Sequence, residues 1–116
     1  MDFLVDRDPD TGRAVIVCPK HLNTNNSGEL KDILNDLVTR SFFRIILDLS
    51  MCRYVDSSGL GAIVSRIADL RAGGGDVRVA GANDHVTGLF RLTNLDKIIS
   101  LFDSVDEAEH SFQEHK

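Results

Sequence analysis

Apolar and polar residues alternate near the start of the chain and again after a polar turn. Phe3 to Arg7 alternates between apolar and polar positions, which predicts a half-buried strand. Asp8 to Gly12 is dense in turn-forming residues, and Ala14 to Cys18 is an apolar run typical of a second strand. The two segments predict a β-hairpin. Pro19 has no N–H group to donate, so we expect the second strand to end there.

The pattern then changes to helical spacing. Residues 23–27 are rich in helix-capping side chains, and the apolar positions that follow predict a helix to about Arg40. Phe42 to Leu49 is mostly apolar, which favours a central strand covered on both faces. After a loop at 51–55, apolar residues at helical spacing predict a single second helix from about Ser57 to the glycines at 73–75.

The last third of the chain predicts four shorter elements. These are a strand at Val77–Ala80, a short helix around Val86 to Phe90, a short strand at Ile98–Ile99, and a helix opened by the capping box Ser104–Glu107. Strands therefore alternate with helices after the hairpin. This order predicts an α/β fold in one domain, 1–116, with a mostly parallel mixed sheet opened by a β-hairpin and about four helices.

Composition excludes several classes of function. Net charge is −5, with 13 basic and 18 acidic residues and no Lys/Arg cluster, which argues against nucleic acid or an anionic membrane as a partner. The two cysteines form no CxxC pair, and the four histidines show no metal or triad spacing, so we expect no metal and no cofactor. Without a signal peptide or a long apolar stretch, the chain is expected to be cytoplasmic. The sequence does not determine the oligomeric state, and a monomer is the default expectation.

One segment carries candidate chemistry, namely Asp56-Ser57-Ser58-Gly59 at the start of the second predicted helix. The first N–H groups of a helix lack internal partners, so these residues fit plain capping, with Gly59 and Gly61 allowing close packing on the sheet. A phosphoryl group on Ser57 would add about −1.5 to −2 charges, which a helix N-terminus tolerates. The residues alone leave both interpretations open.

Three segments together resemble a known family. Tyr54 to Ile63, Arg71 to Val79 and Val86 to Ile99 are similar to the corresponding segments of STAS domains, specifically the bacterial anti-sigma factor antagonists. The resemblance runs in order over nearly the whole chain. It implies a STAS-type fold with a phosphorylatable serine at position 57, flanked by Asp56 and Ser58.

The resemblance also implies a partner-switching cycle. The unphosphorylated protein would bind a histidine-kinase-like (HPK-like) serine kinase that doubles as an anti-sigma factor, and so release that factor's target. Phosphorylation of Ser57 would break the complex, and a PP2C-like phosphatase would reset it. ATP, metal and catalytic groups belong to those partners, so the chain itself is expected not to be an enzyme.

The chain departs from the family in one place. Many members carry Gly-Glu-Leu-Asp where this chain has Lys20-His21-Leu22-Asn23, so Asn23, expected beside the phosphosite, lacks a charge. The loops after Cys18 and Leu49 should emerge together, since both follow carboxyl ends of strands. We therefore expect a partner-binding surface that combines Thr24, Asn25 and Asn26 with Gly61, Ser65 and Arg66 of the second helix.

Two other functions compete with this hypothesis. The first is a STAS scaffold that never cycles, in which Ser57 is only a helix cap. The second is a small enzyme or nucleotide binder, for which no complete motif is present: Gly59-Leu60-Gly61 lacks the third glycine of a dinucleotide site, and Gly73-Gly74-Gly75 lacks the Lys-Ser/Thr of a phosphate loop.

Overall fold

The predicted hairpin begins a five-stranded sheet in the computed structural model, which describes residues 3–113. The strand order is β1-β2-β4-β6-β7, and only the β1–β2 pair is antiparallel. The strands are β1 (Leu4–Asp8), β2 (Arg13–Val17), β4 (Arg44–Asp48), β6 (Asp76–Ala80) and β7 (Leu101–Phe102). The mostly parallel mixed sheet and the opening hairpin are thus confirmed.

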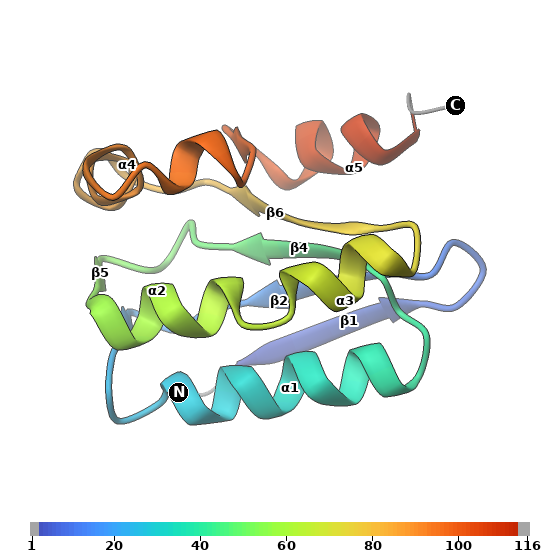
Figure 1. The fold of residues 1–116 in the computed structure, drawn as a ribbon. Helices are drawn as coiled ribbons and strands as arrows, with labels where there is room; N and C mark the ends of the chain where they lie inside the picture. Colours follow the sequence, from blue (N-terminus) through green and yellow to red (C-terminus); the bar gives the residue numbers. More distant parts are fainter. Residues whose placement is uncertain (1–2, 114–116) are drawn as a thin grey trace.

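Helices cover both faces of this sheet. Figure 1 shows α1 (Ser27–Thr39), α2 (Ser57–Val64) and α3 (Ile67–Ala72) below it and α5 (Val105–Gln113) above it. In β4, Ile45 and Leu47 are buried in the core under α1 and α2, whereas Ile46 is buried against α5. Successive side chains of a strand point to opposite faces, which is why this strand is apolar throughout.

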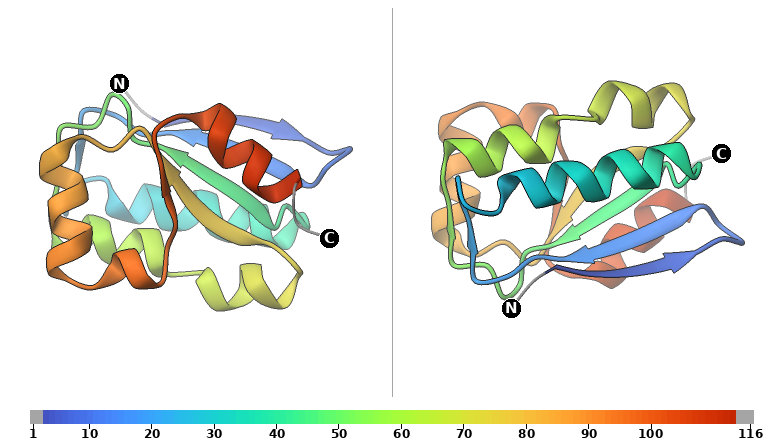
Figure 2. Two further views of the ribbon diagram at one scale, coloured as in Figure 1. Left: turned by 90° about the horizontal axis from the view of Figure 1, so that it is seen from above. Right: turned by 90° about the horizontal axis from the view of Figure 1, so that it is seen from below.

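Helix α4 (Asp84–Leu92) lies beyond the carboxyl ends of the parallel strands and not on a face of the sheet. Figure 2 shows it crossing that end of the sheet instead of lying on either face. Its N-cap is Asn83, whose side chain accepts a hydrogen bond from the N–H of Val86 at 2.8 Å. The N-terminus of α2 lies at the same end of the molecule (Figure 1), so the loops there can form one continuous surface.

A second, two-stranded sheet was not anticipated. β3 (His21–Leu22) pairs in parallel with β5 (Tyr54–Val55), in segments that the sequence analysis treats as loops. Two-residue strands have no hydrophobic periodicity to detect, and this pairing joins positions more than thirty residues apart. It exists only because β2 and β4 are neighbours and direct the following segments alongside each other.

The second predicted helix is two helices, so its prediction as one continuous element is wrong. α2 ends at Val64 and α3 begins at Ile67. At the break, Ser65 donates from both its N–H and its hydroxyl to the Ala62 carbonyl, at 3.2 and 2.7 Å. A serine hydroxyl that competes for a backbone carbonyl weakens the regular helical ladder, and Arg66 then takes non-helical angles, φ −122° and ψ 18°.

The prediction of the final strand at Ile98–Ile99 is also wrong, because β7 begins at Leu101. The 3₁₀ helix η1 (Leu95–Lys97) directly precedes this segment, and the N–H groups of Ile98 and Ile99 donate to the Leu95 carbonyl. Ile99 is nonetheless buried in the core. The apolar residue Ile99 therefore indicates burial at this position and does not indicate a strand.

Candidate functional site

Asp56 starts helix α2 and leaves Ser57 free. Asp56 is the N-cap, with φ −100° and ψ −175°, and its Oδ1 accepts a hydrogen bond of 3.0 Å from the N–H of Gly59. Ser57 is therefore the first helical residue, and it is exposed to solvent. The alternative in which Ser57 acts as the helix cap is wrong, since a neighbouring carboxylate already has that role.

The segment after β3 lies directly against this helix start. The N–H of Asp56 donates to the Leu22 carbonyl at 3.1 Å, which continues the β3–β5 pairing. The N–H of Thr24 donates to Asp56 Oδ2 at 3.3 Å, and the hydroxyls of Thr24 and Ser58 lie 3.1 Å apart. The structure thus brings Thr24, Asp56 and Ser58 together around Ser57.

Gly59 allows helix α2 to approach β3 closely. A Cβ at this position would lie 2.6 Å from the Leu22 carbonyl oxygen and 2.9 Å from a Val55 methyl group. Outside its own helix, a Cβ at Gly61 would have no neighbour within 4 Å among the residues that the structure describes, and Gly61 is exposed. The expectation of close packing is therefore correct for Gly59 and wrong for Gly61.

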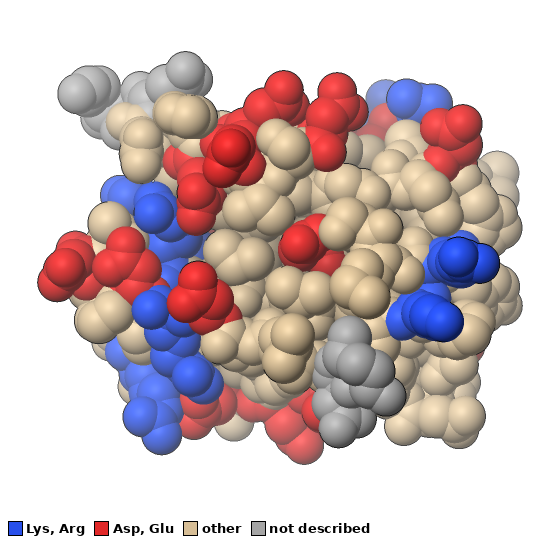
Figure 3. Space-filling view, turned by 180° about the vertical axis from the view of Figure 1, so that it is seen from behind, with Lys and Arg blue, Asp and Glu red and all other residues tan. Residues whose placement is uncertain are grey.

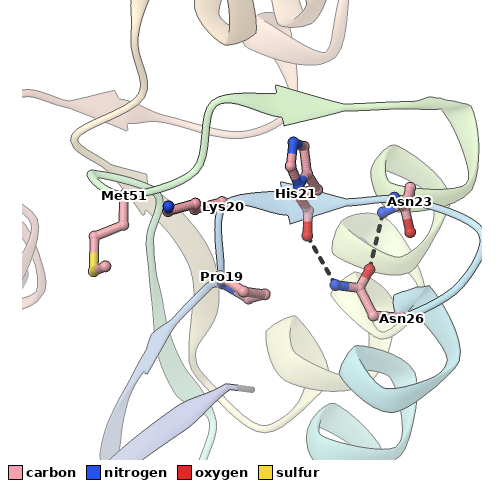
Figure 4. A pocket seen from close by; sticks show the side chains of 6 residues that line it. All are labelled: Pro19, Lys20, His21, Asn23, Asn26 and Met51. Carbon is pink, nitrogen blue, oxygen red and sulfur yellow. Dashed lines mark hydrogen bonds between the residues drawn. The ribbon is translucent and has the colours of Figure 1, made fainter. Parts of the chain in front are cut away.

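The asparagines of the β3–α1 loop mainly hold the loop itself. Asn23 Oδ1 accepts from the N–H of Asn25 at 3.0 Å, and Asn26 bridges the Asn23 N–H and the His21 carbonyl at 2.9 and 2.8 Å (Figure 4). Within residues 3–113, no hydrogen bond joins the Asn23 side chain to Asp56 or Ser57. Thr24, and not Asn23, is the loop residue that contacts the segment around Ser57.

Ser65 and Arg66 lie at the far end of α2 from Ser57. The helix has eight residues, so the two ends are separated by about 12 Å at 1.5 Å per residue. Ser57, Gly61 and Ser65 are four residues apart and form one exposed stripe. Arg66 instead bonds within the protein, to Asp69 at 2.9 Å and to Asn35 of α1.

A hollow opens beside β3, on the loop that carries Thr24. Its volume is about 530 Å³, and Figure 4 shows the residues that line it, namely Pro19, Lys20, His21, Asn23, Asn26 and Met51. Lys20 and Met51 lie on one side of the hollow, and Asn23 and Asn26 lie on the other. It is a mixed polar and apolar depression with Lys20 on its rim.

Sequence reasoning missed an aromatic row at this end of the molecule. The ring of Tyr54 stacks on His85 of α4, with centroids 6.1 Å apart, and meets His21 edge-on at 6.5 Å. The side chain of Tyr54 is 47% exposed. A sequence signal existed, since Tyr54 is the only tyrosine in the chain and stands three positions before Ser57.

The remaining candidate groups are the two cysteines and the residue types that bind metal ions. Cys18 and Cys52 are both buried, and burial raises the pKa of each thiol, so neither is an activated nucleophile. No group of three or more His, Cys, Asp or Glu within residues 3–113 is arranged to hold a metal ion. Over the same residues, no helix is both long and apolar enough to cross a membrane.

Known proteins share this architecture. A Thermotoga maritima protein assigned as an anti-sigma factor antagonist is 32% identical over 96 residues, covering 81% of this chain and 85% of that protein. A crystal structure of a Thermotoga maritima protein with the same assignment superposes with a TM-score of 0.82 at 28% identity, covering 96% of this chain and 94% of that one.

The fold is also that of the anti-sigma factor antagonist SpoIIAA. Its unphosphorylated form gives a TM-score of 0.76 at 16% identity, covering 98% of this chain and 99% of that one. The phosphorylated Bacillus protein gives 0.73 at 17%, covering 94% and 97%. The STAS domain model matches residues 4–108. Because that match spans nearly all of the described sheet and helices, this chain belongs to the STAS domain family.

Proposed function

We propose that this protein is an anti-sigma factor antagonist that works by partner switching. Its unphosphorylated form binds an HPK-like serine kinase that is also an anti-sigma factor, and so releases the factor's target. Phosphorylation of Ser57 ends that binding, and a PP2C-like phosphatase restores it. The cycle draws on ATP in the cytoplasm, and this chain contributes a binding surface and an acceptor hydroxyl instead of catalysis.

The observation that carries the proposal is the position of Ser57. It is exposed at the first position of α2, directly after a formed cap. Its hydroxyl makes no hydrogen bond within residues 3–113, so a kinase would not have to break a structural contact to reach it. The neighbouring Ser58 hydroxyl is less available, since it lies 3.1 Å from that of Thr24.

The same position explains why modification changes binding and not folding. A phosphoryl group adds about −1.5 to −2 charges and three strong acceptors. At the N-terminus of α2 the helix dipole favours negative charge, so the fold tolerates the group. A partner seated on the helix start, however, meets a new anion within its interface. SpoIIAA, which has this fold, exists in phosphorylated and unphosphorylated forms.

The test is phosphorylation by a defined kinase. Each purified HPK-like serine kinase of the source organism is incubated with ATP and with the wild type, Ser57→Ala or Ser58→Ala, and the products are mapped by mass spectrometry. We expect one phosphate on the wild type and on Ser58→Ala, mapped to Ser57, and none on Ser57→Ala. Calorimetry with the same kinase should then show binding that Ser57→Asp abolishes.

Other outcomes revise the proposal in defined ways. Phosphate mapped to Ser58 keeps the cycle and moves the acceptor by one residue. Binding that neither Ser57→Asp nor phosphorylation weakens would favour the non-cycling scaffold. If no kinase of this type binds or modifies the wild type, the partner-switching function is wrong.

A further inference from the structure

The exposed face of α2 is poorly equipped to anchor a partner by itself. Its stripe consists of Ser57, Gly61 and Ser65, which are all small. Binding energy at protein interfaces concentrates in a few large side chains, most often Trp, Tyr and Arg, that fill pockets on the partner. The stripe lets a partner approach closely, but the affinity has to come from larger residues nearby.

Those larger residues gather in the segment before Ser57. Of the five large apolar side chains exposed in residues 3–113, two lie there, Met51 at 49% and Tyr54 at 47%. Both belong to the segment between β4 and α2. Met51 lines the hollow beside β3, and Tyr54 stands between His21 and His85. Tyr54 thus forms a ridge and Met51 lines a hollow, and both adjoin the segment of Ser57.

Tyr54 is held in place before any partner arrives. Its backbone is fixed by the pairing with His21 in β3, and its ring contacts His21 on one side and His85 on the other. Three segments distant in sequence therefore converge on one exposed ring. A side chain that is already ordered loses little conformational entropy on binding, which makes it an efficient anchor.

The exposed charges near this ring are two cations, Lys20 and Arg53, and the carboxylate of Asp84, which precedes His85, so the balance here is basic although the chain as a whole is acidic. Lys20 and Arg53 are exposed, and the N–H of Arg53 donates to the Lys20 carbonyl at 2.7 Å, so the two residues adjoin. Asp56, two positions after Tyr54, already accepts hydrogen bonds from the N–H groups of Gly59 and Thr24. Figure 3 shows a compact basic pair at this end of the back face, across mostly uncharged surface from a column of basic side chains at the other end.

We propose that the partner's footprint is centred on Tyr54, flanked by Lys20, Arg53 and Met51, and that the partner surface seated there is acidic. This inference rests on the proposed function, since it assigns the surface that the same anti-sigma factor occupies. Tyr54 enters an apolar pocket of the partner, and a carboxylate of the partner enters the hollow beside Lys20. The exposed end of α2 around Ser65 and Arg66 lies outside this footprint.

The position of this footprint explains how phosphorylation of Ser57 would weaken partner binding. A basic patch attracts an acidic partner surface, and rim charges of this kind act mainly on the rate of association. A phosphate three positions from Tyr54 adds about −1.5 to −2 charges beside the patch. It offsets most of the positive charge of Lys20 and Arg53 and places an anion against the acidic partner surface, so binding is weakened without any change of fold.

The test measures binding of the purified kinase that the wild type binds, by calorimetry and by stopped-flow or surface kinetics over a range of salt concentrations. The variants are Tyr54→Ala, Tyr54→Phe and the double variant Lys20→Glu/Arg53→Glu. Ile98→Ala is the matched control for Tyr54, because Ile98 is equally exposed at 48% but lies after η1. Lys31→Glu/Lys97→Glu changes the net charge equally at exposed positions on α1 and η1.

We expect Tyr54→Ala to weaken binding by about tenfold or more and Tyr54→Phe to stay near the wild type, since the ring is the anchor. Lys20→Glu/Arg53→Glu should slow association by about tenfold and remove most of its salt dependence. Both controls should bind within about twofold of the wild type. Unfolding curves for each variant separate lost contacts from lost fold.

Each contrary outcome is decisive. If Ser57→Asp abolishes binding while Tyr54→Ala or the charge-reversal variant binds within twofold of the wild type, the footprint lies elsewhere and the proposed function stands. If the charge-reversal variant associates faster than the wild type, the partner surface is basic and the inference is wrong. If no HPK-like kinase binds the wild type, the inference and the proposed function fail together.

Discussion

The backbone N–H of Thr24 donates a hydrogen bond of 3.3 Å to the Oδ2 atom of Asp56, 32 positions further along the chain. The other oxygen of the same carboxylate accepts from the N–H of Gly59 at 3.0 Å. One side chain thus caps helix α2 and fastens the β3–α1 loop to it. Replacing Asp56 should therefore loosen two segments at once.

Asp56→Ala should destabilise the protein by about 1–2 kcal/mol, because it removes a helix cap and leaves two backbone N–H groups without their acceptor. Urea unfolding measures the loss. Asn83→Ala is the matched control, because the Asn83 side chain also caps a helix, α4, by accepting one hydrogen bond of 2.8 Å from the Val86 N–H, and within residues 3–113 it makes no bond to a distant loop. Equal losses in the two variants would show that the link to Thr24 contributes no stability.

Two glycines of the same helix should respond in opposite directions to the same substitution. Gly59→Ala should cost about 1–3 kcal/mol, since the added methyl group would lie 2.6 Å from the Leu22 carbonyl oxygen. Gly61→Ala should stabilise the protein by about 0.5–1 kcal/mol, because nothing lies within 4 Å and alanine favours helix. Thermal unfolding of both variants checks the pair, and a destabilised Gly61→Ala would contradict the helix position described for residue 61.

Substitution of Ser57 should leave folding almost unchanged. Ser57 is exposed, and the cap of α2 is Asp56, so Ser57→Ala should change the free energy of unfolding by less than about 0.5 kcal/mol. Ser57→Asp should likewise fold normally, because a helix N-terminus favours an added negative charge. A loss of about 1 kcal/mol or more in Ser57→Ala, as measured by urea unfolding, would restore a structural role for the hydroxyl.

The buried thiols should make stability depend on alkaline pH. Burial raises the pKa of Cys18 and of Cys52 in the folded protein, whereas an unfolded cysteine titrates near about 8.5. Above that pH the unfolded chain loses protons that the folded chain retains, so stability should fall as pH rises. Below it the thiols should contribute no pH dependence.

Unfolding at a series of pH values measures this effect, and Cys18→Ala should reduce it. At pH 8 a thiol reagent such as DTNB should react slowly with the native protein and rapidly in denaturant. Rapid labelling of the native protein would contradict the burial of both side chains.

Sequence periodicity was sufficient for the parts of the fold that bury long faces. Leu30, Leu34 and Leu37 recur at helical spacing and are all fully buried in α1, and the continuous apolar run of β4 lies between two layers of helix. Periodicity was insufficient where one hydroxyl group or a short turn determined the backbone conformation. Ser65 ends α2 by bonding to Ala62, and Ile99 reaches the core from a 3₁₀ turn and not from a strand.

For the site, the sequence by itself determined the helix start, because Asp56 caps it by accepting a hydrogen bond from the Gly59 N–H within one turn. Only the tertiary structure decided which other residues contact this segment. Thr24 contacts Asp56 from the loop after β3, and His21 of β3 and His85 of α4 contact Tyr54. Those contacts depend on the order of strands in the sheet, and local spacing carries no information about segments that become neighbours only when the sheet forms.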